Sequence, residues 1–222
     1  MAQGYIRTDE LPQVIPVFPL DAAVLLPRGR LPLNIFEPRY LNMVDDAMAG
    51  DRIIGMVQTT GGDTAHPLLA RVGCAGRITS FAETQDGRYL VTLSGVCRFV
   101  VGAELPMAGP YRQVRADYDP FADDLAAPET ITFERDELLA SLRSYLQRRG
   151  MDIEWDAARE APPDALITSL SMALPFEVAE KQALVEARTL PERVATLVAL
   201  LQIDDMGGRD QDDDGPTPRS IQ

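Results

Sequence analysis

Two apolar runs near the N-terminus, Ile15–Leu20 and Leu31–Tyr40, are each interrupted by prolines. Proline lacks the backbone N–H that a central strand uses, so within sheets it is confined to edge strands, first positions and bulges. The two runs therefore predict short edge strands that turn corners, as at the start of a small open barrel.

Strong β signals continue from Val14 to about Tyr118. Two β-rich runs, Arg71–Phe81 and Arg88–Phe99, flank an Asp-Gly pair, which is a strong hairpin signal. Glycines inside these runs predict bulges or bends that close a sheet into a barrel. These glycines are Gly73, Gly76 and Gly95.

One helix is expected to interrupt the β-rich region. Pro38 suits a first helical turn, apolar residues follow it at helical spacing, and Gly50 can end the helix. A short buried strand is predicted directly afterwards, over Ile53–Val57.

The hydrophobic period becomes helical beyond about residue 130. Apolar faces recur over Leu138–Leu146, Leu166–Leu174, Ala179–Leu184 and Val194–Leu201. Asp164 is expected to cap the second of these helices. Thr189 and Glu192 are expected to form a capping box at the start of the last one.

These patterns divide the chain into five expected segments. They are an N-terminal arm over 1–13, a small β-barrel over 14–118, an acidic linker over 119–129, a helical bundle over 130–203 and a disordered acidic tail over 204–222. A β-rich half followed by a helical half predicts the α+β class.

Composition narrows the classes of partner. The formal net charge of −13 would repel a phosphate backbone, so nucleic acid is not expected as a partner. Almost all basic side chains are arginines, with Lys181 as the only lysine, which is interpreted as genomic bias rather than function. No apolar run is long enough to cross a membrane, and the N-terminus lacks the features of a secretory signal. We therefore expect a cytoplasmic protein, with Cys74 and Cys97 as free thiols.

Three separated motifs resemble the N-terminal substrate-binding domain of Lon-type proteases. They are the proline-rich start, the hairpin that closes with a glycine, two residues and an arginine, and a leucine-proline pair followed by glutamate-lysine-glutamine. Pro191–Val194 also resembles the family's arginine-bearing last helix. The residues that carry the resemblance are Pro16, Pro19, Leu20, Pro32, Leu33, Glu37, Arg39, Tyr40, Gly73, Gly95, Arg98, Leu174, Pro175, Lys181 and Gln182.

The resemblance covers roughly residues 14 to 203 and implies a PUA-like barrel followed by helices. It also implies a non-catalytic module that recognises unfolded or exposed apolar polypeptide in protein quality control, with a separate protease or ATPase as a further partner. No Gly-Lys-Ser/Thr phosphate loop occurs in the sequence, so no nucleotide cofactor is expected. The family's catalytic serine–lysine pair belongs to a later domain that these residues do not include.

Residues that could carry chemistry lack the partners that catalysis or metal binding needs. Cys74, Cys97 and the lone His66 do not have the paired spacing of zinc ligands, so the cysteines are interpreted as small core residues. His66 lies in a loop-like sequence without a nucleophile motif. Lys181 follows Glu177 by one helical turn, which is the spacing of a surface ion pair.

Two alternatives remain open at this stage. One is a hydrolase that uses scattered carboxylates such as Asp21 and Glu37. The other is RNA binding through the barrel, which the negative charge disfavours. Glu37, Arg39 and Tyr40 can also be a polar recognition site, although a charged first helical turn is commonplace.

Overall fold

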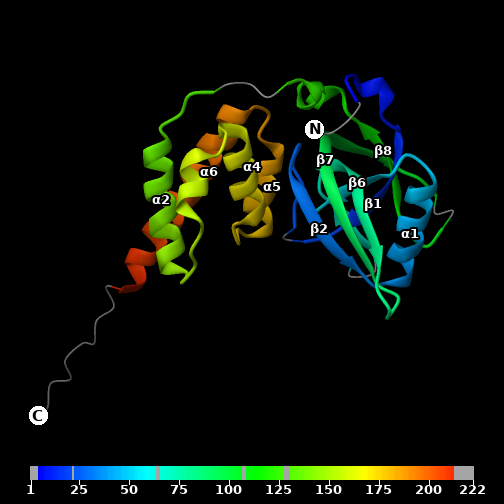
Figure 1. Cartoon of the computed structure of the whole chain (residues 1–222), viewed down its shortest axis with the longest axis horizontal. Coiled ribbons are helices and arrows are strands. Elements are labelled where there is room, and N and C mark those ends of the chain that lie inside the picture. Colours follow the sequence, from blue (N-terminus) through cyan, green and yellow to red (C-terminus); the bar gives the residue numbers. More distant parts are fainter. Residues whose placement is uncertain (1–4, 22, 64–65, 107–108, 128–130, 213–222) are drawn as a thin grey trace, which may run out of the picture.

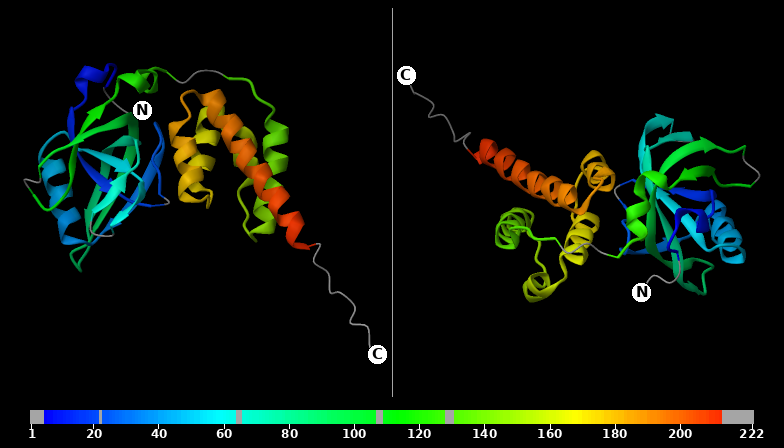
Figure 2. Two further views of the ribbon diagram at one scale, coloured as in Figure 1. Left: turned by 180° about the vertical axis from the view of Figure 1, so that it is seen from behind. Right: turned by 90° about the horizontal axis from the view of Figure 1, so that it is seen from above.

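The computed structural model describes residues 5–21, 23–63, 66–106, 109–127 and 131–212. Strands and helix α1 form one part of the molecule, and helices α2–α6 form a second part beside it (Figure 1). Figure 2 shows from behind and from above that the helical part lies along one side of the barrel. The predicted α+β class is confirmed.

The elements follow the expected order along the chain. The strands are β1 Val14–Pro19, β2 Arg30–Ile35, β3 Ile53–Val57, β4 Thr59–Asp63, β5 His66–Leu69, β6 Val72–Glu83, β7 Tyr89–Glu104 and β8 Gln113–Asp117. The helices are η1 Thr8–Glu10, α1 Pro38–Ala49, η2 Asp119–Leu125, α2 Arg135–Arg148, α3 Trp155–Glu160, α4 Pro163–Ala173, α5 Val178–Glu186 and α6 Leu190–Asp212, where η marks a 3-10 helix.

The main sheet closes on itself through β7. Its strand order is β2-β7-β6-β3-β1-β8, and β7 also pairs with β8. The N-terminal half of β7 pairs with β2, as in Leu31↔Leu93, and its C-terminal half pairs with β8. Strand β2 therefore lies at the edge, as its proline predicts.

Strand β1 departs from the prediction, because it is not an edge strand. It pairs with β8 along its first half and runs parallel to β3 along its second half. The first half of β1 thus has a partner strand on one side only, and the second half has one on the other side only. On the unpaired side of each half, a backbone N–H would have no acceptor in a neighbouring strand. Pro16 and Pro19 are tolerated in a central strand for that reason.

The glycines of the long hairpin mark irregularities and close approaches. The register between β6 and β7 shifts at Ala75/Gly76, opposite Gly95. A Cβ at Gly95 would lie 1.9 Å from the carbonyl oxygen of Leu26, so only glycine fits there. The extra residue is Val96 on β7, so the predicted irregularity is confirmed as a bulge beside Gly76 and Gly95.

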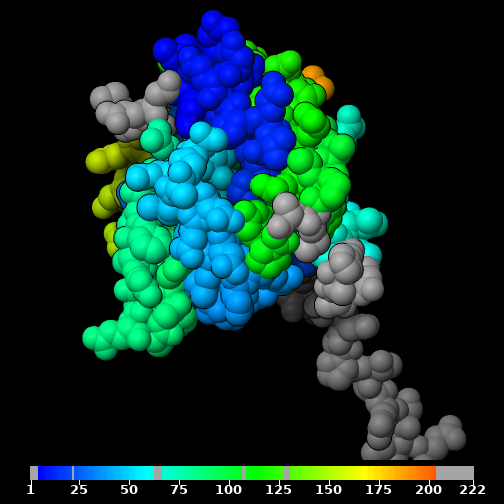
Figure 3. Space-filling view, turned by 90° about the vertical axis from the view of Figure 1, so that its right-hand side faces the viewer, coloured from blue at the N-terminus to red at the C-terminus, as the bar shows by residue number. Residues whose placement is uncertain are grey.

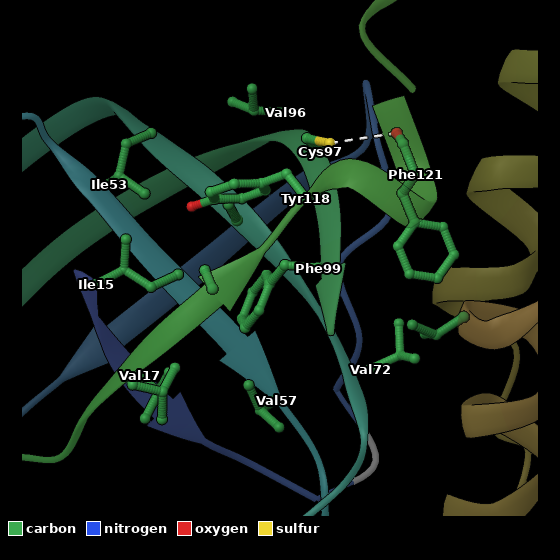
Figure 4. Close-up of a cluster of buried hydrophobic side chains, with 14 of the residues drawn as sticks. Ile15, Val17, Ile53, Val57, Val72, Val96, Cys97, Phe99, Tyr118 and Phe121 are labelled. Atoms are coloured by element: carbon green, nitrogen blue, oxygen red, sulfur yellow. Dashed lines mark hydrogen bonds between the residues drawn. The ribbon is translucent and has the colours of Figure 1, made fainter. Parts of the chain in front are cut away.

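Three apolar clusters hold the fold together. Ile15, Val17, Phe99 and Tyr118 belong to the cluster that fills the barrel (Figure 4). A second cluster joins α1 to the outside of the barrel, and Figure 3 shows α1, in light blue, covering that face. The third cluster lies within the helical part, around Tyr145.

Several local predictions are corrected. The hairpin of β4 and β5 was not predicted, and His66 begins β5 rather than lying in a loop. Helix α3 was also missed. Helix α4 begins at Pro163, so Asp164 occupies its first turn and is not the N-cap. Proline at the first helical position is favourable because its missing N–H is not needed there.

The last helix runs further than expected. Helix α6 continues to Asp212, although its end was predicted near residue 203. A helix that is already nucleated can propagate through residues with modest helix propensity, which the apolar period does not reveal. The expected tail over 213–222 lies outside the described residues. The capping box of Thr189 and Glu192 is confirmed by two backbone-to-side-chain hydrogen bonds of 3.3 and 3.2 Å.

Candidate functional site

Arg98 on β7 joins the barrel to the helical part. Its side chain is 3% exposed, and Nη2 lies 2.8 Å from Oδ1 of Asp124, which is 10% exposed. Its Nε and its backbone N–H also donate to Oδ2 of the same carboxylate, each at 2.9 Å. The guanidinium stacks 4.4 Å from the ring centroid of Phe121. Asp124 and Phe121 both belong to η2, so the segment expected to be a linker packs firmly against β7.

The same guanidinium caps the C-terminal end of α5. Its Nη atoms donate to the carbonyl oxygens of Val185 at 3.0 Å and Arg188 at 2.9 Å, and also to that of Ala187. The last carbonyls of a helix lack partners within the helix and carry partial negative charge, so a cation stabilises them. Arg98 therefore bonds to η2 and α5 at once.

A glutamine pair makes a second connection between the two parts. Gln58, directly after β3, donates to the carbonyl of Val178 and to the side chain of Gln182, both at 3.0 Å. Gln182 in turn donates to the carbonyl of Val72 on β6 at 3.1 Å. Gly73 is adjacent, and a Cβ there would lie 2.6 Å from the carbonyl oxygen of Met56.

Two basic residues of the helical part are buried. Lys181 is 5% exposed, and its Nζ donates to the carbonyl of Met172 at 3.2 Å, so the prediction of a surface ion pair is wrong. Burial lowers the pKa of Lys181. Arg193 on α6 is 6% exposed and donates to the carbonyl of Leu184 at 2.9 Å. Glu177 caps α5 instead of facing Lys181.

The other motif residues stabilise local structure. Tyr40 packs edge-to-face on Phe18 with ring centroids 4.2 Å apart. Arg39 lies 4.6 Å above the Tyr40 ring and 2.8 Å from a carboxylate oxygen of Glu37. The remaining motif residues fall in β1 or directly after it, in β2, or at the turn before α5; they are Pro16, Pro19, Leu20, Pro32, Leu33, Leu174 and Pro175.

The groups considered for catalysis have structural partners. The carboxylate of Asp21 accepts hydrogen bonds from the backbone N–H of Thr59 at 3.1 Å and from its hydroxyl. Glu37 pairs with Arg39. Nothing in these contacts joins the two carboxylates into one site.

The two cysteines are buried between strands. Cys97 donates to the carbonyl of Phe121 at 3.4 Å (Figure 4). Burial raises the pKa of both thiols, and the negative charge of Asp124 raises them further. Among the described residues, no three His, Cys, Asp or Glu side chains come close enough to hold a metal ion. No helix in the described part of the chain could span a membrane.

Exposed apolar side chains gather where the β6–β7 hairpin leaves the barrel. Phe36 is 64% exposed and Leu90 46%, and these two residues are called the hairpin patch below. Leu90 pairs with Asn34 on β2, two residues before Phe36. Phe81, 39% exposed, pairs with Val91 and contacts Tyr89 with ring centroids 4.9 Å apart, so it points to the opposite face of the hairpin from Leu90. Figure 3 shows this hairpin projecting beside the lower end of α1.

The chain matches the family described as "ATP-dependent protease La (LON) substrate-binding domain" over residues 14–202. The chain belongs to this family. The match spans both the barrel and the helices, and it confirms the resemblance that the three motifs indicated.

Individual relatives agree with this assignment. The chain is 26% identical to "Lon protease 2" of Myxococcus xanthus over 89% of this chain and 24% of that protein. It is 27% identical to "Lon protease 2" of Sorangium cellulosum over 84% of this chain and 24% of that protein. The chain thus spans about a quarter of the length of these relatives.

Solved structures show the same fold. The N-terminal domain of a Mycobacterium avium complex Lon protease superposes with a TM-score of 0.61 at 19% identity, covering 85% of this chain and 98% of that one. A Lon N-terminal domain protein from Xanthomonas campestris gives a TM-score of 0.59 at 22% identity, covering 84% of this chain and 97% of that one.

Sequence reasoning missed Asp124 and Phe121, the partners of Arg98. Both lie in the acidic stretch that was interpreted as a linker. The one available signal was Phe121, the single aromatic residue of this acidic segment, because large apolar side chains are seldom left in solvated linkers.

Proposed function

We propose that this chain is a non-catalytic module that binds unfolded or exposed apolar segments of other proteins in protein quality control. The observation that carries the proposal is the hairpin patch on a chain whose family is described as substrate-binding. Grouped exposed apolar side chains mark sites of contact with other proteins. Because the matched relatives are Lon proteases, we expect captured segments to pass to a separate protease or ATPase.

The barrel over residues 14–118 and the helical bundle over 130–203 are proposed as the two units of this module. The contacts of Arg98 and Gln182 between them support a fixed arrangement rather than independent units. The patch lies on the barrel, so we assign capture to the barrel. The helical part then stabilises it.

Binding through apolar contact has a distinct salt dependence. Salt leaves apolar contact unchanged or strengthens it, whereas phosphate binding weakens steeply as salt rises. The test is a titration of the protein with a denatured polypeptide and with RNA, each at low and high salt. Salt-insensitive binding of the polypeptide is expected. Tight, salt-sensitive RNA binding without polypeptide binding would overturn the proposal.

Variants locate the binding surface. Phe36→Ser and Leu90→Ser should each weaken polypeptide binding about tenfold, since burying one large apolar side chain contributes about 1.5 to 3 kcal/mol. Met151→Ser is the matched control, because Met151 is 41% exposed but lies between α2 and α3. Equal loss in all three variants would show that the patch is not the site.

A separate assay addresses catalysis. The purified chain, incubated with ATP and an unfolded substrate, is expected to hydrolyse neither. Sustained cleavage that a point substitution of Asp21 or Glu37 abolishes would instead establish the hydrolase alternative.

A further inference from the structure

A cavity of about 160 Å³ lies where the barrel meets the helical part. Its walls come from η2 and the residues after it, the start of α4, and the turn between α5 and α6. Four arginines line it, namely Arg28, Arg98, Arg188 and Arg193. The chain as a whole carries a net charge of −13, and the hairpin patch gives no reason for such a group of cations.

The charges around the cavity do not cancel. Asp123, Asp124 and Asp164 also line it, which leaves a net formal charge of +1 against the four arginines. Asp124 is committed to Arg98, at 2.8 Å. Asp123 is exposed and Asp164 is half-buried, so water screens both. The uncompensated charge therefore favours a ligand that carries a single negative charge.

Arg193 is the second buried cation among these residues, and unlike Arg98 it has no carboxylate partner in the described part of the chain. It is 6% exposed, and within the described part of the chain its guanidinium bonds only to backbone carbonyls. Burial, with repulsion from Arg98, lowers the pKa of Arg193 to about 10. A buried charge without an ionic partner is costly, and a bound anion would offset that cost.

Thr168 on α4 supplies an unused polar group. The residue is 8% exposed and lines the cavity, yet its hydroxyl makes no hydrogen bond to any described residue. Leu190, which begins α6, lines the same cavity and places the positive end of that helix dipole there. A largely buried residue whose hydroxyl has no partner among the described residues, beside a buried cation, is arranged for a ligand rather than for the fold.

We propose that this cavity binds the C-terminal carboxylate of the polypeptide that the hairpin patch holds, with Arg188, Arg193 and the hydroxyl of Thr168 as its donors. The site rests on the proposed polypeptide binding and specifies which part of the polypeptide is recognised. A cavity of about 150 Å³ accommodates benzene, which is close in size to an alanine residue with its terminal carboxylate. Ala126 and Ala127 give the wall small apolar surfaces, so a small apolar last residue fits best.

The cavity and the hairpin patch are within reach of one polypeptide. Arg28 lines the cavity and Phe36 belongs to the patch, and β2, of six residues, connects them. Six residues of strand span about 20 Å, at about 3.4 Å per residue. An extended peptide of about eight residues therefore spans both sites.

The experiment compares two peptides with the full chain. Both are apolar ten-residue peptides that end in alanine, one with a free carboxylate and one with a C-terminal amide, titrated by fluorescence anisotropy. The free acid should bind at least tenfold more tightly, and raising the salt should reduce this difference. Thr168→Val and Arg188→Gln should each weaken binding of the acid several-fold and leave the amide unchanged. Arg159→Gln, an exposed arginine on α3, is the matched control.

The outcomes separate this site from the proposed function. Equal binding of the acid and the amide overturns the carboxylate site and leaves polypeptide binding intact. Failure of both peptides and of denatured protein to bind overturns the proposed function and the site together. Displacement of the acid by inorganic phosphate at lower concentration than by acetate would assign the cavity to phosphate and overturn the proposal.

Discussion

Replacing Arg98 by methionine should destabilise the whole fold more than a typical substitution does. Methionine retains an unbranched, apolar stem like that of arginine but has no guanidinium. The carboxylate of Asp124, only 10% exposed, would then lose its cationic partner. It also removes the donors to the carbonyls of Val185 and Arg188 at the end of α5. Breaking a buried ion pair by removing one partner costs about 3 to 5 kcal/mol. We expect the free energy of unfolding to fall by that amount.

Urea denaturation followed by circular dichroism measures this loss. Asp124→Leu and the double variant complete a mutant cycle, and the double variant should be more stable than the sum of the single changes by about 0.5 to 3 kcal/mol. Arg159→Met is the matched control, because its pair with Asp156 is exposed and surface pairs contribute about 0 to 1 kcal/mol. A loss for Arg98→Met no larger than that of the control would refute the argument.

Three further predictions concern backbone packing, alkaline pH and the thiols. Gly95→Ala should lower the free energy of unfolding by about 1 to 3 kcal/mol or more, since the new Cβ would lie 1.9 Å from a carbonyl oxygen. Gly109→Ala is the control in the same urea assay and should change that free energy little, because the nearest atom to its new Cβ lies at 3.6 Å. Burial and a carboxylate raise the pKa of Tyr111 to about 12, so its stabilisation is complete below pH 10 and is lost as the pH rises toward 12; Tyr111→Phe should flatten that decline in pH-dependent unfolding. Cys74 and Cys97 should react with a thiol reagent only after denaturation, because burial raises their pKa, and rapid reaction of the native protein would contradict their placement.

Local patterns predicted most of the secondary structure. The Asp-Gly turn, the helix from Pro38 and the box of Thr189 and Glu192 all depend on residues close in sequence, and the structure has each of them. The prolines of β1 were a poorer guide, because they predicted an edge strand. Whether a strand lies at an edge depends on partners far along the chain, and β1 has two of them.

The contacts of Arg98 between the barrel and the helical part were harder to predict from the sequence. Arg98 was singled out by its motif, but its partner Asp124 lies in a stretch whose composition is that of a linker. A buried ion pair leaves no periodic signal, because each residue alone has the character of the surface. Lys181 was misinterpreted for the same reason, since the spacing to Glu177 is equally typical of an exposed helix face.

The pairing of β1 with β8 has a consequence for synthesis on the ribosome. The N-terminal half of β1, around Ile15, has its partner in β8, around Val114. A chain made from its N-terminus therefore carries one side of β1 unpaired until nearly the whole barrel has emerged. Closing so long a separation is slow, and an unpaired apolar strand is open to association in the meantime. During the first half of its own synthesis, this protein is therefore itself an unfolded chain with an exposed apolar segment, the kind of chain that it is proposed to capture.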